Sequence, residues 1–321
     1  HPTGTLKNRL IEGDTLALDL TIGSSKRKKL LENRSLRTRP LTDDKAVLSW
    51  NALMVQSLAD GFLATGRNEL KYAAIQNIKT CLNIANEFGE LFRSYRENKC
   101  SGSAYLEDYA SVILACIKVH EITLDQKWLL DALKIADSML ETFWDDESPI
   151  PYDVKADDPF LPMRPRNIFD NAVPSGLSQA LEALSLLSTL TGNEKYNNIV
   201  ISILDRTSNT AFSSPLSFAN LLRTARNSVD PSVEVMISVP NYESSEGFLE
   251  VLGSVYLPNR VILGVIQDKN VTDDLKALYS PISEGRIDEF YDKSTVYLCR
   301  NYSCQLPVHS PAEFLSQLKG I

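Results

Sequence analysis

The sequence has little of what marks several large classes of protein. Cysteine occurs only 5 times in 321 residues, and this odd number leaves at least one thiol outside any disulfide framework. Basic residues (33) are outnumbered by acidic ones (41), and the net charge of -8 argues against binding nucleic acid by neutralising its phosphates. No apolar run is long enough to cross a bilayer. We therefore expect a soluble protein of the cytoplasm, or of an organelle, with no nucleic-acid or membrane partner.

Signals for a bound cofactor or metal ion are also missing. The chain has neither the Gly-rich fingerprint of dinucleotide-binding folds nor a phosphate-binding P-loop. His309 follows Cys299 and Cys304, but a fourth zinc ligand is lacking. His120 stands near the end of an apolar helical pattern, where we expect it to pack rather than to act in catalysis. We predict that the protein uses no cofactor and no metal.

Three similar turns divide much of the chain into helical hairpins. Each turn is a short polar stretch with an aromatic residue soon after it, at residues 65–69 before Tyr72, 123–127 before Trp128 and 191–195 before Tyr196. The turns join first helices predicted at 43–64, 105–122 and 174–190 to second helices predicted at 68–88, 126–144 and 194–208. A unit that recurs about every 60 residues in this way is an array of αα-hairpins.

The two kinds of predicted helix differ in their apolar patterns. The first helix of the array is apolar on every side, whereas the second carries one apolar stripe that includes Ile75, Ile78 and Leu82. Two concentric rings of helices require this difference, because an inner helix is packed between the axis and the outer ring, whereas an outer helix is packed on one side. The sequence therefore predicts a mainly α fold, an α/α toroid of helical hairpins. A linear solenoid of hairpins is the alternative.

From about Val229 the pattern changes and β-branched residues become frequent. Residues 233–239, 260–266 and 296–300 are predicted strands, with a helix at 244–252. We expect this to be a small α/β region appended to the helices. The resulting division is an extended segment over 1–41, expected to be the tail of a missing upstream region, a hairpin toroid over 42–228, and an α/β segment over 229–321 that closes with a C-terminal helix.

Polar residues collect where the three first helices begin. Equivalent helix ends lie on one face of a ring, so three acidic clusters would converge on one mouth. Acidic residues and serine also favour helix N-termini for capping and dipole reasons, which is the simpler interpretation of each cluster. Two stretches, residues 91–96 and the long connection 145–174, are expected to overhang the mouth.

Converging carboxylates and aromatic rings suit a sugar, because carboxylates accept hydroxyl hydrogen bonds or transfer protons and aromatic faces stack on sugar rings. The candidate catalytic acids and bases are Asp44, Glu107, Asp108 and Asp170. The candidate ligand-binding residues are Arg39, Asp43, Lys45, Trp50, Asn51, Tyr109, Arg166, Asn171 and Ser175.

Cys299 and Cys304 are the one closely spaced pair of cysteines, and their spacing is too long for a C-x-x-C redox motif. We favour structural thiols, with a reversible disulfide or exchange with a partner thiol as the alternative. The pair is therefore the candidate redox site of the chain.

An ordered set of motifs resembles a known family. The set consists of Arg34, Arg37, Arg39, Pro40, Asp43, Asp44, Lys45, Trp50 and Asn51, then LEDYA at 106–110, DNAVPSG at 170–176 and C-x4-C-x-x-P at 299–307. It is similar to the thioredoxin-domain-containing proteins typified by spermatogenesis-associated proteins and their bacterial relatives. The resemblance implies an upstream thioredoxin-like domain, which we expect to be missing here. It also implies a six-hairpin toroid of the glycosidase and sugar 2-epimerase type, which is not necessarily complete in this chain.

The chain departs from the family pattern at two places near the proposed mouth. Leu177 stands where the family usually has Asn, and Ile150-Pro151 replaces an expected Gly-Gly. The sequence thus leaves two functions open. One is a sugar epimerase-like or glycosidase-like enzyme, and the other is a non-catalytic scaffold or thiol partner that serves the thioredoxin-like domain.

Overall fold

The computed structural model describes residues 16–145, 147–156, 163–230, 232–267, 293–300 and 303–320. The chain forms two units, His1–Asp44 and Lys45–Ile321. In the first, helix α2 (Leu16–Ser35) occupies much of the segment that we expected to be extended. Leu, Lys, Arg and Glu dominate its second half and favour helix without tertiary support, since residues 25–44 are exposed.

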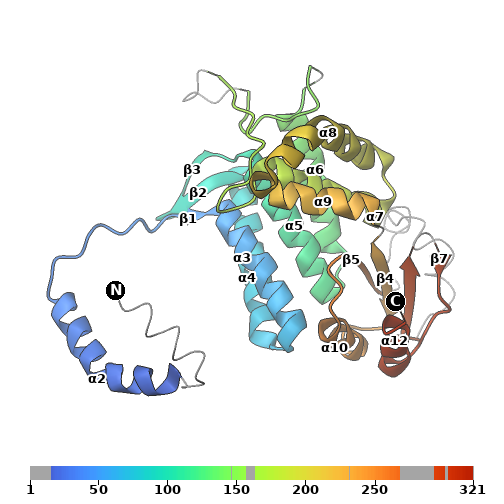
Figure 1. The fold of residues 1–321 in the computed structure, drawn as a ribbon, viewed down its shortest axis with the longest axis horizontal. Coiled ribbons are helices and arrows are strands. Elements are labelled where there is room, and N and C mark those ends of the chain that lie inside the picture. The colour runs from blue at the N-terminus through green and yellow to red at the C-terminus, as the bar shows by residue number, and fades with distance from the viewer. Residues whose placement is uncertain are drawn as a thin grey trace. The chain divides into compact units, whose positions relative to one another are not determined.

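The second unit is built on three helical hairpins followed by a further helix (Figure 1). Their residue bounds are α3 (Leu48–Thr65) with α4 (Asn68–Phe88), α5 (Leu106–Thr123) with α6 (Lys127–Phe143), and α7 (Gly176–Thr191) with α8 (Glu194–Ser213). A 3-10 turn, η1 (Pro215–Phe218), leads to α9 (Ala219–Val229), which packs against α7. The repeat predicted from the three turns is confirmed.

The three hairpin turns share one hydrogen-bond pattern. Thr65, Thr123 and Thr191 each donate a side-chain hydrogen bond to the carbonyl four residues earlier, and each hydroxyl accepts from the backbone N–H two residues later. The residue between has a left-handed backbone, with φ of 67° at Gly66, 56° at Leu124 and 69° at Gly192. Leu124 tolerates this strained conformation because its side chain is fully buried.

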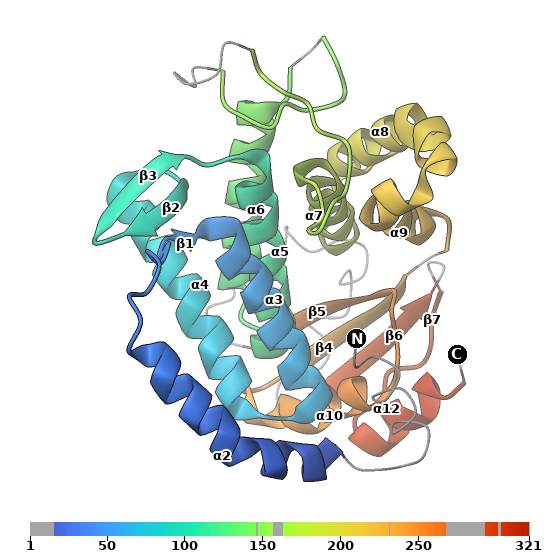
Figure 2. The same ribbon diagram turned by 60° about the vertical axis from the view of Figure 1, so that its left-hand side comes forward.

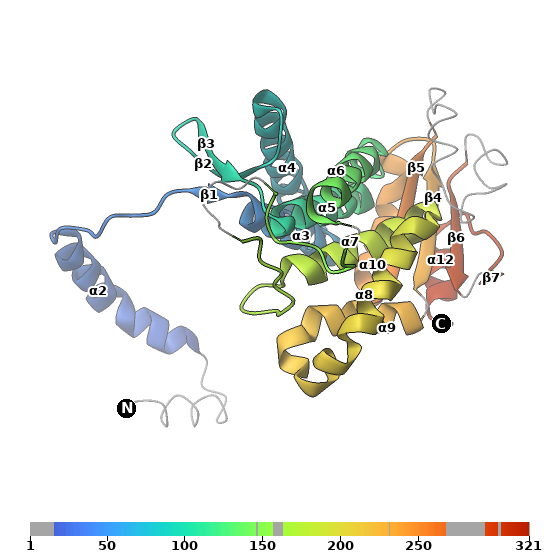
Figure 3. The same ribbon diagram turned by 90° about the horizontal axis from the view of Figure 1, so that it is seen from above.

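Inner helices α3, α5 and α7 lie side by side, with α4, α6 and α8 behind them (Figures 2 and 3). α5 has an inner neighbour on both sides and is buried almost all round. Among the inner helices, α3 packs mainly against α5, and its side chains Trp50 and Met54 are 63% and 54% exposed. The prediction that α3 is buried on every side is therefore wrong, while the mainly α architecture, an α/α toroid of helical hairpins, is confirmed.

A small antiparallel sheet stands where the chain enters the first hairpin. Its order is β1-β2-β3, formed by β1 (Ala46–Val47), β2 (Phe92–Arg96) and β3 (Lys99–Ser103). We expected a helix to begin at Asp43, but pairing of β1 with β2 holds Ala46 and Val47 extended and delays the start of α3 to Leu48. The extended piece predicted at 91–96 is confirmed by β2.

The α/β region contains a four-stranded sheet of order β5-β4-β6-β7. β4 (Val233–Val239) and β5 (Arg260–Ile266) are parallel and joined through η2 (Glu243–Ser245) and α10 (Glu246–Ser254), whereas β6 (Thr295–Arg300) and β7 (Ser303–Cys304) are antiparallel. Helix α12 (Pro311–Leu318) follows and packs on α10. The predicted strands and the C-terminal helix are thus present. A disulfide joins Cys299 to Cys304, the pairing that we ranked below free structural thiols.

The α/β region is packed against the C-terminal ends of the inner helices (Figure 2). Gly253 of α10 lies so close to α3 that a Cβ added there would be 1.8 Å from the carbonyl oxygen of Leu63. The hydroxyl of Tyr242 donates to the carbonyl of Ile122 at 3.1 Å. These contacts explain why helices and sheet form one unit, rather than dividing near residue 228. No helix in the described ranges has the length and apolarity needed to span a membrane.

Candidate functional site

A pocket of about 330 Å³ lies at the N-terminal ends of α5 and α7, and we call it the entrance pocket. Arg93 and Tyr105 form one side with Glu107, and Ser175 and Gly176 form another. The connection between α6 and α7 supplies the remaining wall, made of Asp153, Val154, Pro165, Asn167, Phe169, Asn171, Val173 and Pro174. Three of the candidate residues, Glu107, Asn171 and Ser175, line this cavity.

Asp108 is fully buried behind this pocket and joins three segments of the fold. Its Oδ1 accepts from the backbone N–H of Ser49 at 3.0 Å, at the start of α3, and its Oδ2 accepts from the N–H of Tyr105 at 2.8 Å, at the start of α5. Arg93 of β2 donates to both oxygens, at 2.9 and 3.0 Å. Asp108 thus caps two inner helices, and its oxygens are occupied by protein donors.

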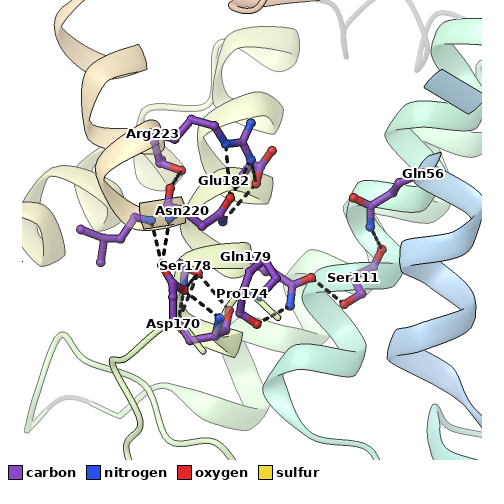
Figure 4. Close-up of polar contacts among 12 residues, drawn as sticks. Gln56, Ser111, Asp170, Pro174, Ser178, Gln179, Glu182, Asn220 and Arg223 are labelled. Atoms are coloured by element: carbon purple, nitrogen blue, oxygen red, sulfur yellow. Dashed lines mark hydrogen bonds and ion pairs between the residues drawn. The ribbon is translucent and has the colours of Figure 1, made fainter. Parts of the chain in front are cut away.

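Asp170 does the same for the inner helix α7 and for α9, which packs against it (Figure 4). Its Oδ1 accepts from the N–H of Ser175 at 2.8 Å and from the hydroxyl of Ser178 at 2.6 Å, where α7 begins. Its Oδ2 accepts from the N–H of Asn220 at 2.9 Å and that of Leu221 at 3.4 Å, where α9 begins. The capping interpretation therefore describes Asp108 and Asp170, which lie at the helix ends but do not line the entrance pocket.

Glu107 differs from its neighbour because its carboxylate faces the pocket. Its Oε1 lies 2.5 Å from Nη1 of Arg93, and the same guanidinium lies 4.8 Å from the ring centre of Tyr105. The Glu107 carboxylate and the Arg93 guanidinium thus form an ion pair at the edge of the cavity.

Asp153 brings a second carboxyl group to the same pocket. Its backbone carbonyl accepts from the N–H of Leu106 at 2.9 Å, which ties the α6–α7 connection to the start of α5. Burial raises the pKa of Asp153 to about 6, helped by the negative charge of Glu107 and opposed by a hydrogen bond from the N–H of Asn167. The pocket thus holds one carboxyl that loses its proton near pH 6 beside one that is paired with an arginine.

The other candidate residues lie in several places. Tyr109 is buried in the core, edge-on to Phe143 with ring centres 5.2 Å apart. Asn51 bridges α3 and α4 by accepting from Asn77 at 3.3 Å. Arg166 pairs with Asp145 at 3.1 Å and stacks on Tyr152, whose ring also contacts Arg164. Lys45 and Trp50 are exposed and do not line the entrance pocket, and Arg39, Asp43 and Asp44 belong to the first unit.

Two residues of the pocket, Arg93 and Asp153, were not among the sequence candidates. Both belong to stretches that we expected to overhang the mouth, so the positions of the stretches were a usable signal. The alternation of β2, which points Phe92 and Ser94 inward, also predicts the opposite direction for Arg93. No group of three or more potential metal ligands occurs in the parts of the chain that the structure describes.

Comparisons of the sequence and the structure with known proteins show which other chains this one is similar to. No protein-family model matches the sequence. The chain is 26% identical over 304 residues to spermatogenesis-associated protein 20 of Mus musculus, covering 89% of this chain and 37% of that protein. It is 25% identical over 309 residues to the Homo sapiens protein of the same name, covering 91% and 38%. The chain therefore spans less than two fifths of the length of these relatives.

Solved structures include a glycoside hydrolase family 76 α-mannanase from Bacteroides thetaiotaomicron, studied as a selenomethionine derivative. It is 17% identical, with a TM-score of 0.46 over 67% of this chain and 60% of the mannanase. The resemblance to spermatogenesis-associated proteins is supported by the sequence comparisons. The thioredoxin-like domain that the resemblance implies stays a prediction.

Proposed function

We propose that the entrance pocket binds a sugar and that Glu107 and Asp153 perform acid–base chemistry on it, in the manner of a glycoside hydrolase. The observation that carries this proposal is the pair of unlike carboxyl groups lining one cavity. Asp153 has a pKa raised to about 6, whereas Glu107 is paired with Arg93. Enzymes of this kind commonly use two carboxyl groups in different environments, one as the acid that donates a proton and the other as an anion.

The roles follow from the charges. Asp153, protonated below about pH 6, donates its proton to the leaving oxygen of the glycosidic bond. The Glu107 carboxylate, paired with Arg93, stabilises the positive charge that develops at the anomeric carbon, or deprotonates the attacking water. The same pair could also serve an epimerase, in which one carboxylate removes a proton from a sugar carbon.

Size and lining support a small carbohydrate. The volume of about 330 Å³ is at the lower end of the range for ligand sites, which suits one sugar ring. Phe169 is 46% exposed at the wall and offers an aromatic face for stacking. Asn167 and Asn171 bring amide groups that donate to and accept from hydroxyls.

A thermal-shift series with mono- and disaccharides tests the proposal, together with hydrolysis of aryl glycosides across pH 4 to 8. We expect one class of sugar to raise the melting temperature of the parent protein, and Glu107→Gln and Asp153→Asn to abolish hydrolysis while keeping the fold. Asp205→Asn is the matched control, because Asp205 is an exposed acid on α8. The proposal is wrong if no sugar binds to the folded protein, or if Asp153→Asn and Asp205→Asn behave alike.

A second candidate function is favoured by the Cys299–Cys304 disulfide. Cys299 is buried and Cys304 is half-buried at the end of the β6–β7 hairpin, so an incoming thiolate would reach Cys304 first. In this hypothesis the helical region is a scaffold whose disulfide is exchanged by a thioredoxin-like domain. A thioredoxin variant lacking its second active-site cysteine should then form a mixed disulfide at Cys304. An unchanged intramolecular disulfide after prolonged incubation would argue against exchange.

A further inference from the structure

A second and larger cavity lies toward the other ends of the inner helices, and we call it the axial cavity. Its volume is about 720 Å³, and it shares no lining residue with the entrance pocket. Side chains from α3, α5, α7 and α9 face it, and the segment 253–261 that leads into β5 closes one side. These four helices and the α/β region thus surround one cavity.

The inner helices carry polar side chains where they face one another near the axial cavity. In Figure 4, Gln56 of α3 donates to the carbonyl of Ser111 on α5, and the hydroxyl of Ser111 donates to Gln179 of α7. Gln56 lies one turn before Asp60, and Gln179 lies three residues before Glu182. These spacings place Gln56 with Asp60, and Gln179 with Glu182, on the same face of their helices, and both acids line the cavity. Polar groups in a toroid core are costly unless they are paired or meet a ligand.

Most charges of the cavity are already paired within the protein. Nζ of Lys118 lies 3.2 Å from Asp60 and 3.0 Å from Glu121, and these two carboxylates raise the pKa of Lys118 against the effect of burial. Arg223 pairs with Glu182, which also accepts from the amide of Asn220 at 3.3 Å. These pairs leave their acids little capacity for a further cation.

Arg260 is the exception. It is the first residue of β5 and lines the cavity, and its Nε is buried without a hydrogen-bond partner among the residues that the structure describes. The positive charge of Arg260 lowers the pKa of Lys118, against the two carboxylates that raise it. A buried guanidinium N–H without an acceptor is unfavourable, and an anionic ligand in the cavity would offset this cost by pairing with the guanidinium charge.

We propose that the axial cavity binds a polyhydroxylated small molecule carrying one carboxylate or phosphate group, with Arg260 holding the anionic group. The hydroxyls would meet Asp60, Glu182 and Asn227, which line the same cavity. An arginine is suited to this role because its planar fork of N–H donors matches the oxygens of a carboxylate or a phosphate. This site is separate from the entrance pocket and does not depend on the function proposed there.

Calorimetric titration tests the proposal with D-glucuronate, D-glucose 6-phosphate and D-glucose as probes. We expect the parent protein to bind one of the two anionic sugars at least about tenfold more tightly than glucose, since one charge-assisted contact is at stake. Which of the two binds identifies carboxylate or phosphate as the anionic group. Arg260→Gln should weaken binding of that probe about tenfold or more, and Glu107→Gln, which alters the entrance pocket, should leave it unchanged.

Arg300→Gln is the matched control, because Arg300 is exposed on β6 and pairs with Asp230 at 3.4 Å, outside the cavity. If Arg260→Gln does not fold, Asn227→Phe provides a second variant that fills the cavity from α9 and should block binding. The proposal is overturned if neither anionic sugar binds at millimolar concentration, or if binding survives both Arg260→Gln and Asn227→Phe. Equal weakening by Arg260→Gln and Arg300→Gln would also contradict it.

Discussion

Nε2 of His120, near the end of α5, accepts a hydrogen bond from the backbone N–H of Gly264 in β5 at 3.1 Å. The other ring nitrogen, Nδ1, lies 3.1 Å from the carbonyl oxygen of Asp125. A peptide N–H can only donate and a carbonyl can only accept, so the ring is neutral and carries its proton on Nδ1. One histidine thereby joins the helical hairpins to the sheet, and the prediction that His120 is a packed residue is consistent with its full burial.

His120 should make the protein less stable in mild acid. Burial lowers the pKa of His120. Protonation of Nε2 would place its new N–H against the backbone N–H of Gly264, and both groups are donors. Because the unfolded chain then binds more protons, the free energy of unfolding falls as pH decreases below about 6.5. His120→Leu should cost about 1–3 kcal/mol at pH 7.5 through its two lost hydrogen bonds and remove this loss in acid. Urea unfolding between pH 5 and 7.5 measures both effects, and an unchanged acid dependence in the variant would contradict the assignment.

Asp153 should have the opposite dependence. Its folded pKa of about 6 lies above the unfolded value of 3.8, so the folded state binds more protons between these values. Its contribution to stability is therefore present below about pH 4 and is lost as pH rises to about 6. We expect Asp153→Asn to be at least as stable as the parent at pH 7.5 and to lack this decline. Urea unfolding at pH 4.5 and 7.5, with Asp205→Asn as control, provides the comparison, and an equal loss of stability at both pH values would refute it.

Replacing the neighbouring acids Glu107 and Asp108 should lower the stability of the protein by very different amounts. Asp108→Ala leaves the buried N–H groups of Ser49 and Tyr105 without their acceptor, removes one of the two carboxylate partners of Arg93, and should cost about 3–5 kcal/mol. Glu107→Gln removes a partly exposed ion pair and should cost at most about 1 kcal/mol. Denaturant unfolding distinguishes the two. Similar costs for both variants would mean that Asp108 does not have the capping role assigned to it.

Close approach of β5 to the end of α5 makes Gly264 hard to replace. A Cβ added there would lie 2.3 Å from Cδ2 and 2.8 Å from Cα of Leu124, and this Cα belongs to backbone that cannot move without displacing the turn. Gly264→Ala should cost about 2–3 kcal/mol or prevent folding. Gly66→Ala, with no atom within 4 Å but φ of 67°, should cost only about 1 kcal/mol. Comparable melting temperatures for the two variants would contradict the packing argument.

The acidic clusters show how far the sequence could predict the candidate site. Acids at a helix start predict either a cap or a reactive group, and sequence spacing cannot decide between them. Adjacent residues Glu107 and Asp108 face different ways, and only Asp108 meets the N–H of Ser49, a residue 59 positions earlier. Asp153 carries no local signal, because its raised pKa comes from burial and from the nearby Glu107.

The amino-acid sequence alone determined the helical hairpins, because their turns, apolar stripes and strand patterns are local properties of the chain. Tertiary structure decided where α3 begins, since β1 pairs with β2 and Asp108 accepts a hydrogen bond from the N–H of Ser49 in the first turn of α3. It also decided which polar groups meet at the entrance pocket and which at the axial cavity. Burial and long-range pairing set the pKa of Asp153 and leave Nε of Arg260 without a partner within the described residues, and neither effect has a local pattern to reveal it.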